Sequence, residues 1–437
     1  MGAAGRSVGE PLRKAVHLGT LLGLPVLRAL PPDRAAAAAF LFTLALLPLG
    51  PTLFRRIARL GESWFRFTAA VAAFPAGTAL FLFLFPERPE IAAGAWAILA
   101  AGDSAAWLAG RFLPRPALPW NRRKSVAGTA AFLLAALPAG ALAAAWIGDL
   151  PLSNAFALLA GPALLGALVE SLPVRGGDNL TVILSSGALL GVLAPGSVIG
   201  PGEIGARVPA AAAVLFLSSL VGLRARAFDR AGAIAGSGLA IVPWLFLGWR
   251  GFLPFLLFIV LGSAAGLIRR AGPPERSARH AAANLGPASL LALLAGLSGS
   301  ATLRAAFLAA VAAPLADTLE SEIGLLSRRP PRLITGGRPV APGTNGAVTP
   351  LGSIAGAAGA LLIAAVGSAV GLVDPSVAAI AAAAGFAGSL GDSVLGATAE
   401  RAGRLTNGEV NFFAALAAAL IVLLVLSVTG AGRTPPT

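Results

Sequence analysis

The sequence predicts an all-α, polytopic helical membrane protein, and its composition is the first observation behind that fold class. Hydrophobic residues make up 57% of the 437 residues and charged residues only 12%, with a mean hydropathy of +0.82. An ordinary soluble domain carries about 25% charged residues. The chain therefore has too little polar surface to cover a water-soluble globule, which excludes a soluble enzyme, a disordered protein and a coiled coil.

Apolar stretches that could cross a bilayer are the second observation. A spanning helix needs about 20 mostly apolar residues, and about fifteen segments approach that length. In the first half we expect spans near 16–30, 35–51, 67–85, 91–109, 125–147, 154–171, 179–199 and 207–223. In the second half we expect them near 231–248, 251–268, 281–298, 302–319, 347–372, 376–399 and 411–430. The first segment is short enough to lie in the membrane interface instead.

Basic residues alternate between the two sides of these spans, which is the third observation. With the N-terminus in the cytoplasm, 26 of the 33 lysines and arginines fall in cytoplasmic segments and 7 outside. The positive-inside rule then favours an N-in, C-out protein of the inner (cytoplasmic) membrane with an odd number of spans. In such a protein a net charge of +14 indicates contact with anionic lipid or phosphate before nucleic acid.

The amino-acid composition limits the kinds of catalytic and metal site that the chain could form. Cysteine is absent and histidine occurs only twice, which excludes thiol nucleophiles, Cys-ligated metals and His-rich metal sites. The sequence also lacks a Walker Gly-x-x-x-x-Gly-Lys-[Ser/Thr] pattern, so a P-loop enzyme is not expected.

Acidic residues at membrane depth are few, grouped, and all on the expected cytoplasmic side. An ionisable side chain inside a bilayer costs about 2.5–3.5 kcal/mol, so it usually faces the protein interior and has a function. These residues are Asp103, Glu170 and Asp178 in the first half and Asp317, Glu320, Glu322 and Asp392 in the second.

A basic loop with glycine and proline accompanies these groups. Both halves read Asp-[Ser/Thr], a glycine seven residues later, the basic loop, and Gly-[Ser/Thr] entering the next helix, which indicates a weak internal repeat of two related halves. Carboxylates, cationic side chains and glycine-rich helix starts are the components of a Mg²⁺–polyphosphate site. Phosphoryl transfer depends mostly on positioning and electrostatic stabilisation, so these types of group are sufficient for a phosphotransferase site.

Four ordered motifs in the first half carry a family resemblance. They are Arg13–His17, Gly102–Arg111, Lys124–Thr129, and Leu168–Glu170 with Asp178–Thr181. Residues from about 10 to 225 thereby resemble the phytol kinase and dolichol kinase family, which is akin to phosphatidate cytidylyltransferases.

Five motifs in the second half carry another. They are Asp317–Gly324, Pro331–Thr335, Val340–Gly346, Gly388–Ala397 and Asn407–Phe412. Residues from about 228 to 430 thereby resemble the phytyl-phosphate kinase family of membrane proteins, and this match is the stronger one.

The two resemblances imply a fusion of consecutive kinases with domains 1–227 and 228–437. The first would phosphorylate an isoprenoid alcohol such as phytol or geranylgeraniol, with Mg²⁺ and with CTP or another nucleoside triphosphate as donor. The second would convert the monophosphate to the diphosphate. The implied partners are these lipids, the nucleotide and membrane lipid, without nucleic acid.

The resemblances and the residue types together nominate the site residues. The catalytic candidates are His17, Asp103, Lys124, Asp178, Asp317, Glu322 and Asp392. The metal-ligand candidates are Asp103, Glu170, Asp178, Asp317, Glu320, Glu322 and Asp392. The nucleotide- and phosphate-binding candidates are Arg13, Lys14, Arg111, Arg123, Lys124, Ser125, Gly128, Thr129, Asn179, Arg332, Arg338, Gly343, Thr344, Asn345, Gly346, Ser393, Asn407 and Asn411.

Some choices stay open at this point. An alcohol needs positioning and a base, for which Asp103 and His17 are equal candidates. A phosphate monoester is already anionic, so Arg332 and Arg338 would hold the acceptor. The alternatives are a CTP-dependent cytidylyltransferase acting on a lipid phosphate and a transporter of a phosphorylated lipid or ion.

Overall fold

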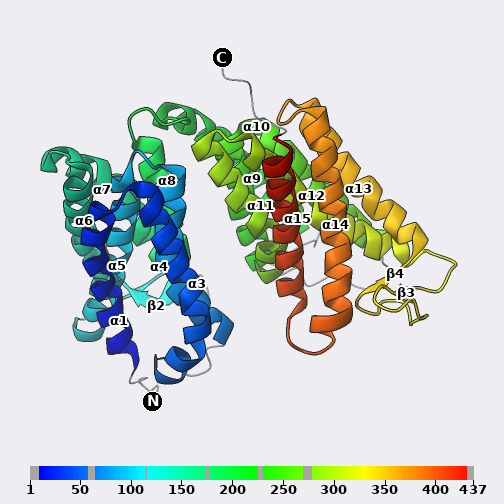
Figure 1. Cartoon of the computed structure of the whole chain (residues 1–437), viewed down its shortest axis with the longest axis horizontal. Helices are drawn as coiled ribbons and strands as arrows, with labels where there is room; N and C mark the ends of the chain where they lie inside the picture. The colour runs from blue at the N-terminus through cyan, green and yellow to red at the C-terminus, as the bar shows by residue number, and fades with distance from the viewer. Residues whose placement is uncertain are drawn as a thin grey trace. The chain divides into compact units, whose positions relative to one another are not determined.

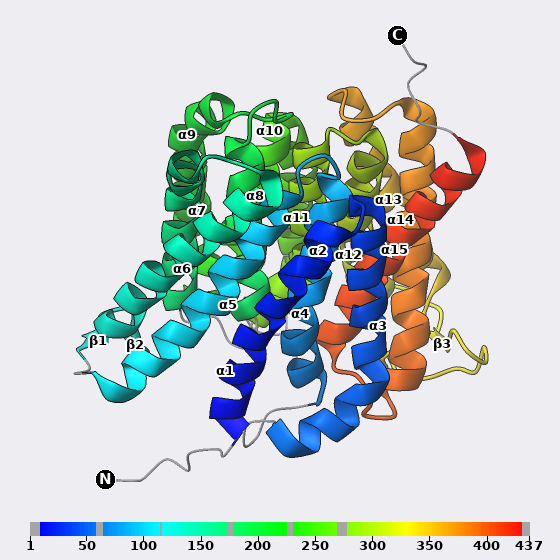
Figure 2. The same cartoon turned by 60° about the vertical axis from the view of Figure 1, so that its left-hand side comes forward.

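The computed structural model describes residues 9–57, 64–113, 116–172, 178–224, 230–268 and 278–430 (Figures 1 and 2). Within these ranges the chain forms fifteen α-helices and two short antiparallel hairpins. Nine helices of the described part are long and apolar enough to cross a membrane, and Phe74–Leu84 and Asn179–Leu193 are shorter apolar helices. This confirms the predicted fold class of a polytopic helical membrane protein.

The chain divides into two compact units, Met1–Ser197 and Val198–Thr437. The structural division lies 30 residues before the boundary expected at 227/228. The reason is that α9 (Pro201–Arg224) packs on α10 (Arg230–Ile268) of the second unit. Which activity belongs to which part of the chain stays a prediction.

In the described residues the first unit has eight α-helices, and α5 contacts α1, α4, α6, α7 and α8. The helices are α1 (Gly9–Gly19), α2 (Leu24–Ala29), α3 (Pro32–Ile57), α4 (Trp64–Leu84), α5 (Pro89–Phe112), α6 (Val126–Gly148), α7 (Leu152–Ser171) and α8 (Asp178–Leu193). A hairpin of β1 (Ala117–Leu118) and β2 (Asn121–Ser125) joins α5 to α6. Phe81, Phe132 and Ile183 fill the interior of this unit.

The first expected span, 16–30, is not one continuous helix. It consists of the end of α1, the 3₁₀ turn η1 (Thr20–Gly23) and the six-residue α2. Gly19 precedes the turn and Gly23 ends it, and Pro25 stands in the first turn of α2, where its missing N–H costs nothing. Gly23 also packs directly under the ring of Trp96, where a Cβ would lie 2.6 Å from the ring.

The second unit is built around α12 (Ala301–Gly324), which contacts α10, α11, α13, α14 and α15. Its other helices are α11 (Ala278–Ser298), α13 (Pro350–Ala369), α14 (Pro375–Leu395), the π-helical η2 (Gly396–Glu400) and α15 (Asn407–Thr429). Every residue of α12 from Ala305 to Ala316 is buried, and most are alanine. Small side chains let membrane helices approach closely, so α12 can be surrounded by five neighbours.

The long helix α10 reverses direction at Gly248, whose φ of 66° and ψ of −162° are not helical. Gly236 lies next to Ala281 at the start of α11, and Gly262 lies next to Thr318 near the end of α12. Phe246, by contrast, packs on Gly296 at the far end of α11. The first arm thus runs alongside α11 from its start towards its far end, and the second arm returns to lie beside the end of α12. The two arms of α10 are therefore antiparallel, in agreement with the expected separate spans 231–248 and 251–268.

Two loops of the second unit lie at the same end of it. The loop 325–349, with β3 (Arg332–Leu333) and β4 (Ala347–Val348), joins α12 to α13, and residues 396–406 join α14 to α15. Figures 1 and 2 show the β3–β4 loop beside the end of α14 that leads into α15. The ends of α12 and α14 thus lie next to the starts of α13 and α15.

Candidate functional site

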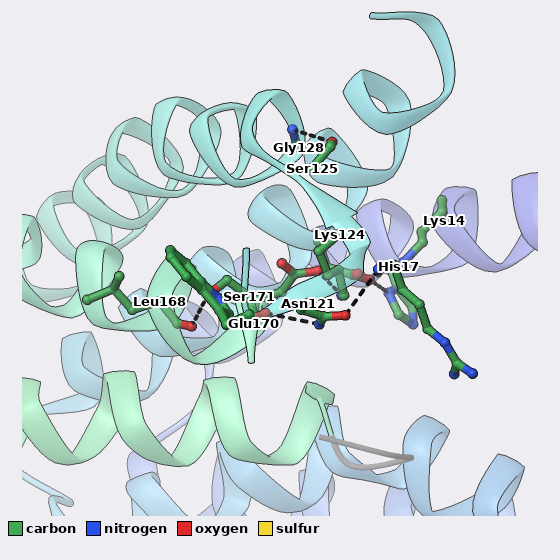
Figure 3. Close-up of polar contacts among 12 residues, drawn as sticks. Lys14, His17, Asn121, Lys124, Ser125, Gly128, Leu168, Glu170 and Ser171 are labelled. Atoms are coloured by element: carbon green, nitrogen blue, oxygen red, sulfur yellow. Dashed lines mark hydrogen bonds and ion pairs between the residues drawn. The ribbon is translucent and has the colours of Figure 1, made fainter. Parts of the chain in front are cut away.

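In the first unit, α1 presents two basic side chains to one carboxylate of α5. Lys14 and His17 are three residues apart and therefore share a helix face. Lys14 Nζ lies 2.5 Å and His17 Nδ1 2.8 Å from the same oxygen, Oδ2 of Asp103. The three side chains are 7–15% exposed, and the His17 ring meets Phe74 edge-on at 4.6 Å. Figure 3 shows Lys14 and His17 side by side on α1.

Further polar contacts hold α1 and the following turn against α5. The indole of Trp96 donates to Thr20 Oγ1 at 3.0 Å, and the Thr20 hydroxyl donates to the carbonyl of His17 at 2.6 Å. Ser104 Oγ reaches the carbonyl of Lys14 at 3.5 Å. These contacts fix the rotation of α1, so Lys14 and His17 are held toward Asp103.

The β1–β2 hairpin is attached to the end of α7 by three side chains. Lys124 Nζ forms an ion pair with Glu170 Oε1, whose side chain is 7% exposed. Asn121 donates to the carbonyl of Ser171 at 3.0 Å, and the indole of Trp120 donates to Ser171 Oγ at 3.2 Å. Figure 3 shows Lys124 and Asn121 next to Glu170 and Ser171. The sequence predicted Glu170 as a metal ligand, and in the structure an ammonium group is its partner.

The start of α6 packs against α5 one helical turn beyond Asp103. Ser125 is the N-cap, and its hydroxyl accepts from the Gly128 amide at 3.1 Å. A Cβ on Gly128 would lie 3.2 Å from the carbonyl oxygen of Ala106, so only glycine permits this approach without displacement. Thr129 Oγ1 is buried and has no hydrogen-bond partner among the described residues. A helix start of this kind favours an anion, because its first amides have no intrahelical acceptor.

The remaining predicted residues of the first unit differ in exposure. Arg111 and Arg123 are exposed, and Arg111 lies 5.7 Å over the Trp107 ring. Arg13 and Asn179 are buried. Asp178 begins α8, and its side chain lies outside the described residues.

In the second unit, four carboxylates from α12, α14 and η2 lie within electrostatic reach of one another. Asp317 and Asp392 each interact with Glu320 and Glu400, and Asp392 also interacts with Asp317. We call Asp317, Glu320, Asp392 and Glu400 the carboxylate cluster. Among the described residues, no lysine or arginine forms an ion pair with any member of the cluster. Uncompensated negative charge in a membrane-embedded site favours the binding of a cation.

Two asparagines connect the cluster to α11 and α15. The Asn411 amide lies 2.9 Å from Oδ1 of Asn284. With its nitrogen turned toward the carboxylate, Asn411 donates to Asp392 Oδ2 at 3.0 Å. The structure therefore places Asn411 against a cluster carboxylate, while its predicted contact with phosphate stays a prediction.

The glycine-rich loop lies directly on the end of α14. Gly346 has a φ of 75°, and a Cβ there would lie 2.5 Å from the amide nitrogen of Ala397 and from the carbonyl oxygen of Ser393. Gly396 faces this loop from the other side, because a Cβ on it would be 3.2 Å from the Gly346 nitrogen and 3.6 Å from Glu400 Oε2. The loop thus lies over the junction of α14 with η2, between Asp392 at the end of α14 and Glu400 at the end of η2.

Arginines lie on the surface of the same loops. Arg332 donates to the carbonyl of Gly337 at 2.7 Å and is exposed. The other exposed arginines of these loops are Arg328, Arg329, Arg338, Arg401 and Arg404. The end of the second unit therefore combines interior carboxylates with a cationic exterior, as an enzyme that binds a metal–polyphosphate complex requires.

Other predicted residues of the second unit lie close by in sequence. Ser393 is buried next to Asp392, and Glu322 is half-buried on α12. The Thr344 hydroxyl forms a hydrogen bond within its own loop, since it donates to the carbonyl of Ala341 at 2.6 Å. Asn407 is exposed at the first residue of α15.

Glu400 is the residue that the sequence interpretation missed. It lies eight residues after Asp392 and beyond the end of α14, in a segment that connects two helices. The intervening η2 is π-helical, and such turns occur frequently at functional sites. The hydrophobic pattern of the sequence Gly-Ala-Thr-Ala-Glu does not indicate a π-helical turn.

The donor set fits magnesium. In the part of the chain that the structure describes, no three His, Asp or Glu side chains already converge as a metal cage. Mg²⁺ usually uses one or two carboxylates together with phosphate oxygens and water. Asp317 and Asp392 supply hard oxygen ligands of that kind, so a metal–nucleotide complex fits them better than a free metal ion.

Comparison with known proteins gives a family model and several relatives. A family model described as "Integral membrane protein DUF92" matches residues 213–419. An uncharacterized membrane protein of Methanocaldococcus jannaschii is 32% identical over 219 residues, which are 48% of this chain and 91% of the relative. An uncharacterized membrane protein of Synechocystis is 34% identical over 187 residues, covering 40% of this chain and 72% of the relative.

A plant relative is more distant. Protein VTE6, a chloroplastic protein of Arabidopsis thaliana, is 28% identical over 182 residues, which cover 38% of this chain and 55% of the relative. No solved structure matches the chain significantly.

Proposed function

The chain belongs to the DUF92 family of integral membrane proteins, and from this premise we propose that it is a membrane kinase of isoprenoid lipids. The second unit phosphorylates an isoprenoid monophosphate to the diphosphate. The first unit makes that monophosphate from the alcohol, with a nucleoside triphosphate such as CTP as donor in at least one step. Both sites face the cytoplasm, where the nucleotide is available.

The observation that carries this proposal is the carboxylate cluster beneath an arginine-rich loop. Membrane carboxylates also occur in ion carriers, but there they lie near the bilayer midplane. Here Asp317 and Asp392 lie in the last two turns of α12 and within one turn of the end of α14. The motifs around both aspartates resemble those of phytyl-phosphate kinases, and the similarity to Protein VTE6 covers 38% of the chain.

In the second unit the acceptor is already an anion, so the reaction needs neutralised charge more than a base. Arg332 and Arg338 hold the acceptor phosphate through charge-assisted hydrogen bonds. Asp317 and Asp392 would hold Mg²⁺, which would supply charge neutralisation on the donor phosphates when bound. The loop amides around Gly346 cover the phosphates and exclude water.

In the first unit the acceptor is an alcohol, which must lose a proton. His17 uses Nδ1 for Asp103, so its Nε2 is the atom that can accept the hydroxyl proton. Asp103 orients the ring and stabilises its protonated form, in the manner of a carboxylate behind a catalytic histidine. The start of α6, with Ser125 and Thr129, binds a donor phosphate one turn away.

The test is a product assay on the full chain in lipid nanodiscs. Phytol, geranylgeraniol and their monophosphates are supplied with Mg²⁺ and each of the four nucleoside triphosphates in turn. Wild type is expected to form monophosphate and then diphosphate, with release of nucleoside diphosphate.

Variants assign the two steps. Asp103→Asn abolishes the first step and retains the second, and Asp392→Asn does the reverse. Asp149→Asn and Asp374→Asn are the matched controls, since Asp149 pairs with Arg28 at an exposed position and Asp374 precedes the first residue of α14, at the opposite end of that helix from Asp392. Both controls retain both steps.

Three results would overturn the proposal. Release of pyrophosphate indicates a cytidylyltransferase, and lipid-coupled flux in liposomes without nucleotide turnover indicates a carrier. Retention of both steps in both aspartate variants shows that the sites are elsewhere.

A further inference from the structure

Glu320 lies at the junction of three helices, in the middle of the carboxylate cluster. The residue is 5% exposed. Ser353, in the first turn of α13, donates to its Oε1 at 2.8 Å, and Ser389 of α14 donates to its Oε2 at 2.9 Å. Each carboxylate oxygen of Glu320 thus has a hydroxyl donor, and the side chain joins α12 to both neighbouring helices.

Glycines make this junction possible. A Cβ on Gly352 would lie 2.5 Å from the carbonyl oxygen of Glu320, and one on Gly356 would lie 3.3 Å from the Glu320 Cβ. On α14, a Cβ on Gly385 would lie 2.5 Å from the Ala312 side chain. Both helices approach α12 so closely because no side chain intervenes, and this brings the two serine hydroxyls within reach of one carboxylate.

The junction sets the geometry of the two aspartates. Asp317 lies three residues before Glu320, on the same face of α12, and Asp392 lies three residues after Ser389 on α14. The bond from Ser389 to Glu320 therefore connects the two helices about one turn from Asp317 and from Asp392, whose carboxylates interact electrostatically. Any change in the spacing of α12 and α14 at Glu320 also changes the separation of the aspartates.

We infer that Glu320 is a positioning residue, which sets the separation of Asp317 and Asp392 through Ser353 and Ser389 and does not itself ligate the metal. This inference rests on the proposed function of the second unit. It differs from the expectation drawn from the sequence, which placed Glu320 among the metal ligands together with Asp317 and Asp392.

The decisive comparison is between two substitutions of Glu320. In Glu320→Gln the amide keeps both contacts, because its oxygen accepts from one serine and its nitrogen donates to the other. Glu320→Ala loses both. We expect Glu320→Ala to lower kcat of the monophosphate step by about 10- to 100-fold, since misplacing reacting groups by about 1 Å costs that much.

Glu320→Gln should stay within about threefold of wild type, because it exchanges one hydrogen-bonded bridge for another. Its half-saturating Mg²⁺ concentration should be unchanged, whereas Asp317→Asn raises that concentration. The double variant Ser353→Ala/Ser389→Ala should reproduce Glu320→Ala. Ser321→Ala is the matched control, since Ser321 is exposed on α12 and donates to the Thr318 carbonyl within its own helix.

A distance measurement tests the same inference without enzyme activity. The chain has no cysteine, so Leu325→Cys and Val394→Cys, both at exposed positions, provide two unique sites for spin labels, directly after α12 and on α14. Double electron–electron resonance should give one narrow distance in the labelled parent and with Glu320→Gln. With Glu320→Ala the distribution should broaden or shift.

Each outcome of these experiments supports or refutes the positioning role of Glu320. The inference is wrong if Glu320→Gln loses activity and Mg²⁺ affinity as Asp317→Asn does, because Glu320 is then a ligand. It is also wrong if Glu320→Ala leaves the interhelical distance unchanged. Absence of kinase activity in wild type would refute the proposed function instead, and the distance measurement would still test the position of the helices.

Discussion

Replacement of Gly346 by alanine tests whether the glycine-rich loop must lie on the end of α14. Gly346 has a φ of 75°, and the new Cβ would lie 2.5 Å from backbone atoms of Ser393 and Ala397. Gly343 offers a matched control in the same loop. Its φ is 82°, but a Cβ there would have nothing within 4 Å.

The two substitutions share one unfavourable free-energy contribution, and only one of them has a second. A left-handed backbone conformation costs alanine about 1–2 kcal/mol at either position. Only Gly346→Ala adds overpacking, typically about 1–3 kcal/mol, because the atoms it meets belong to helix backbone and cannot turn aside. A difference of about 1–3 kcal/mol changes the docked-to-undocked ratio of the loop by about 5- to 150-fold.

Trypsin reports this ratio directly, since the loop carries exposed Arg328 and Arg332, neither of which is followed by proline. With cleavage slow relative to loop closure, the cutting rate follows the undocked population. Gly346→Ala should be cut about 5- to 150-fold faster than Gly343→Ala and should lose the monophosphate step. Equal cutting rates and equal activities in the two variants would refute the docking of Gly346 against α14.

Three further predictions concern the first unit and the metal. Lys14→Ala leaves Asp103 without its ammonium partner in a buried pair and should cost about 3–5 kcal/mol, whereas Arg28→Ala breaks the exposed pair with Asp149 and should cost about 0–1 kcal/mol. Apparent melting temperatures of the two purified variants check this, and equal values would contradict it. Ser125→Ala removes an N-cap, which costs about 1 kcal/mol, and it should raise the KM for nucleotide in the alcohol step while leaving the monophosphate step unchanged. Chelation of divalent cations should stop both steps in the product assay, and added Mg²⁺ should restore them; activity that survives chelation would exclude the metal.

The helices were predictable because their signal is local. The expected spans 125–147 and 154–171 correspond to α6 at Val126–Gly148 and α7 at Leu152–Ser171. Length and hydropathy are sufficient for such helices, since a bilayer requires every backbone group to be satisfied within the segment. The segment 16–30 was less predictable, because glycine and proline divide it into short helices whose packing depends on Trp96 in α5.

The chemical types of the site residues were also predictable, but their partners were not. The sequence singles out Asp103 as a carboxylate at membrane depth, yet Lys14 and His17 precede it by 89 and 86 residues. Glu320 was expected to bind metal, and its hydroxyl partners Ser353 and Ser389 became visible only with the helices in place. A hydrogen bond depends on distances between helices, and no spacing along the chain reports those.

By itself, the amino-acid order specifies a lipid-embedded bundle of helices whose acidic groups gather near the expected cytoplasmic ends, because hydropathy and the cost of buried charge are properties of each segment. The tertiary structure decides which of those groups act together. It turns α10 back at Gly248, brings Glu400 into the carboxylate cluster through the π-helical η2, and gives Glu320 two serine partners. These arrangements arise from close packing between helices, which depends on where glycine and alanine meet across an interface.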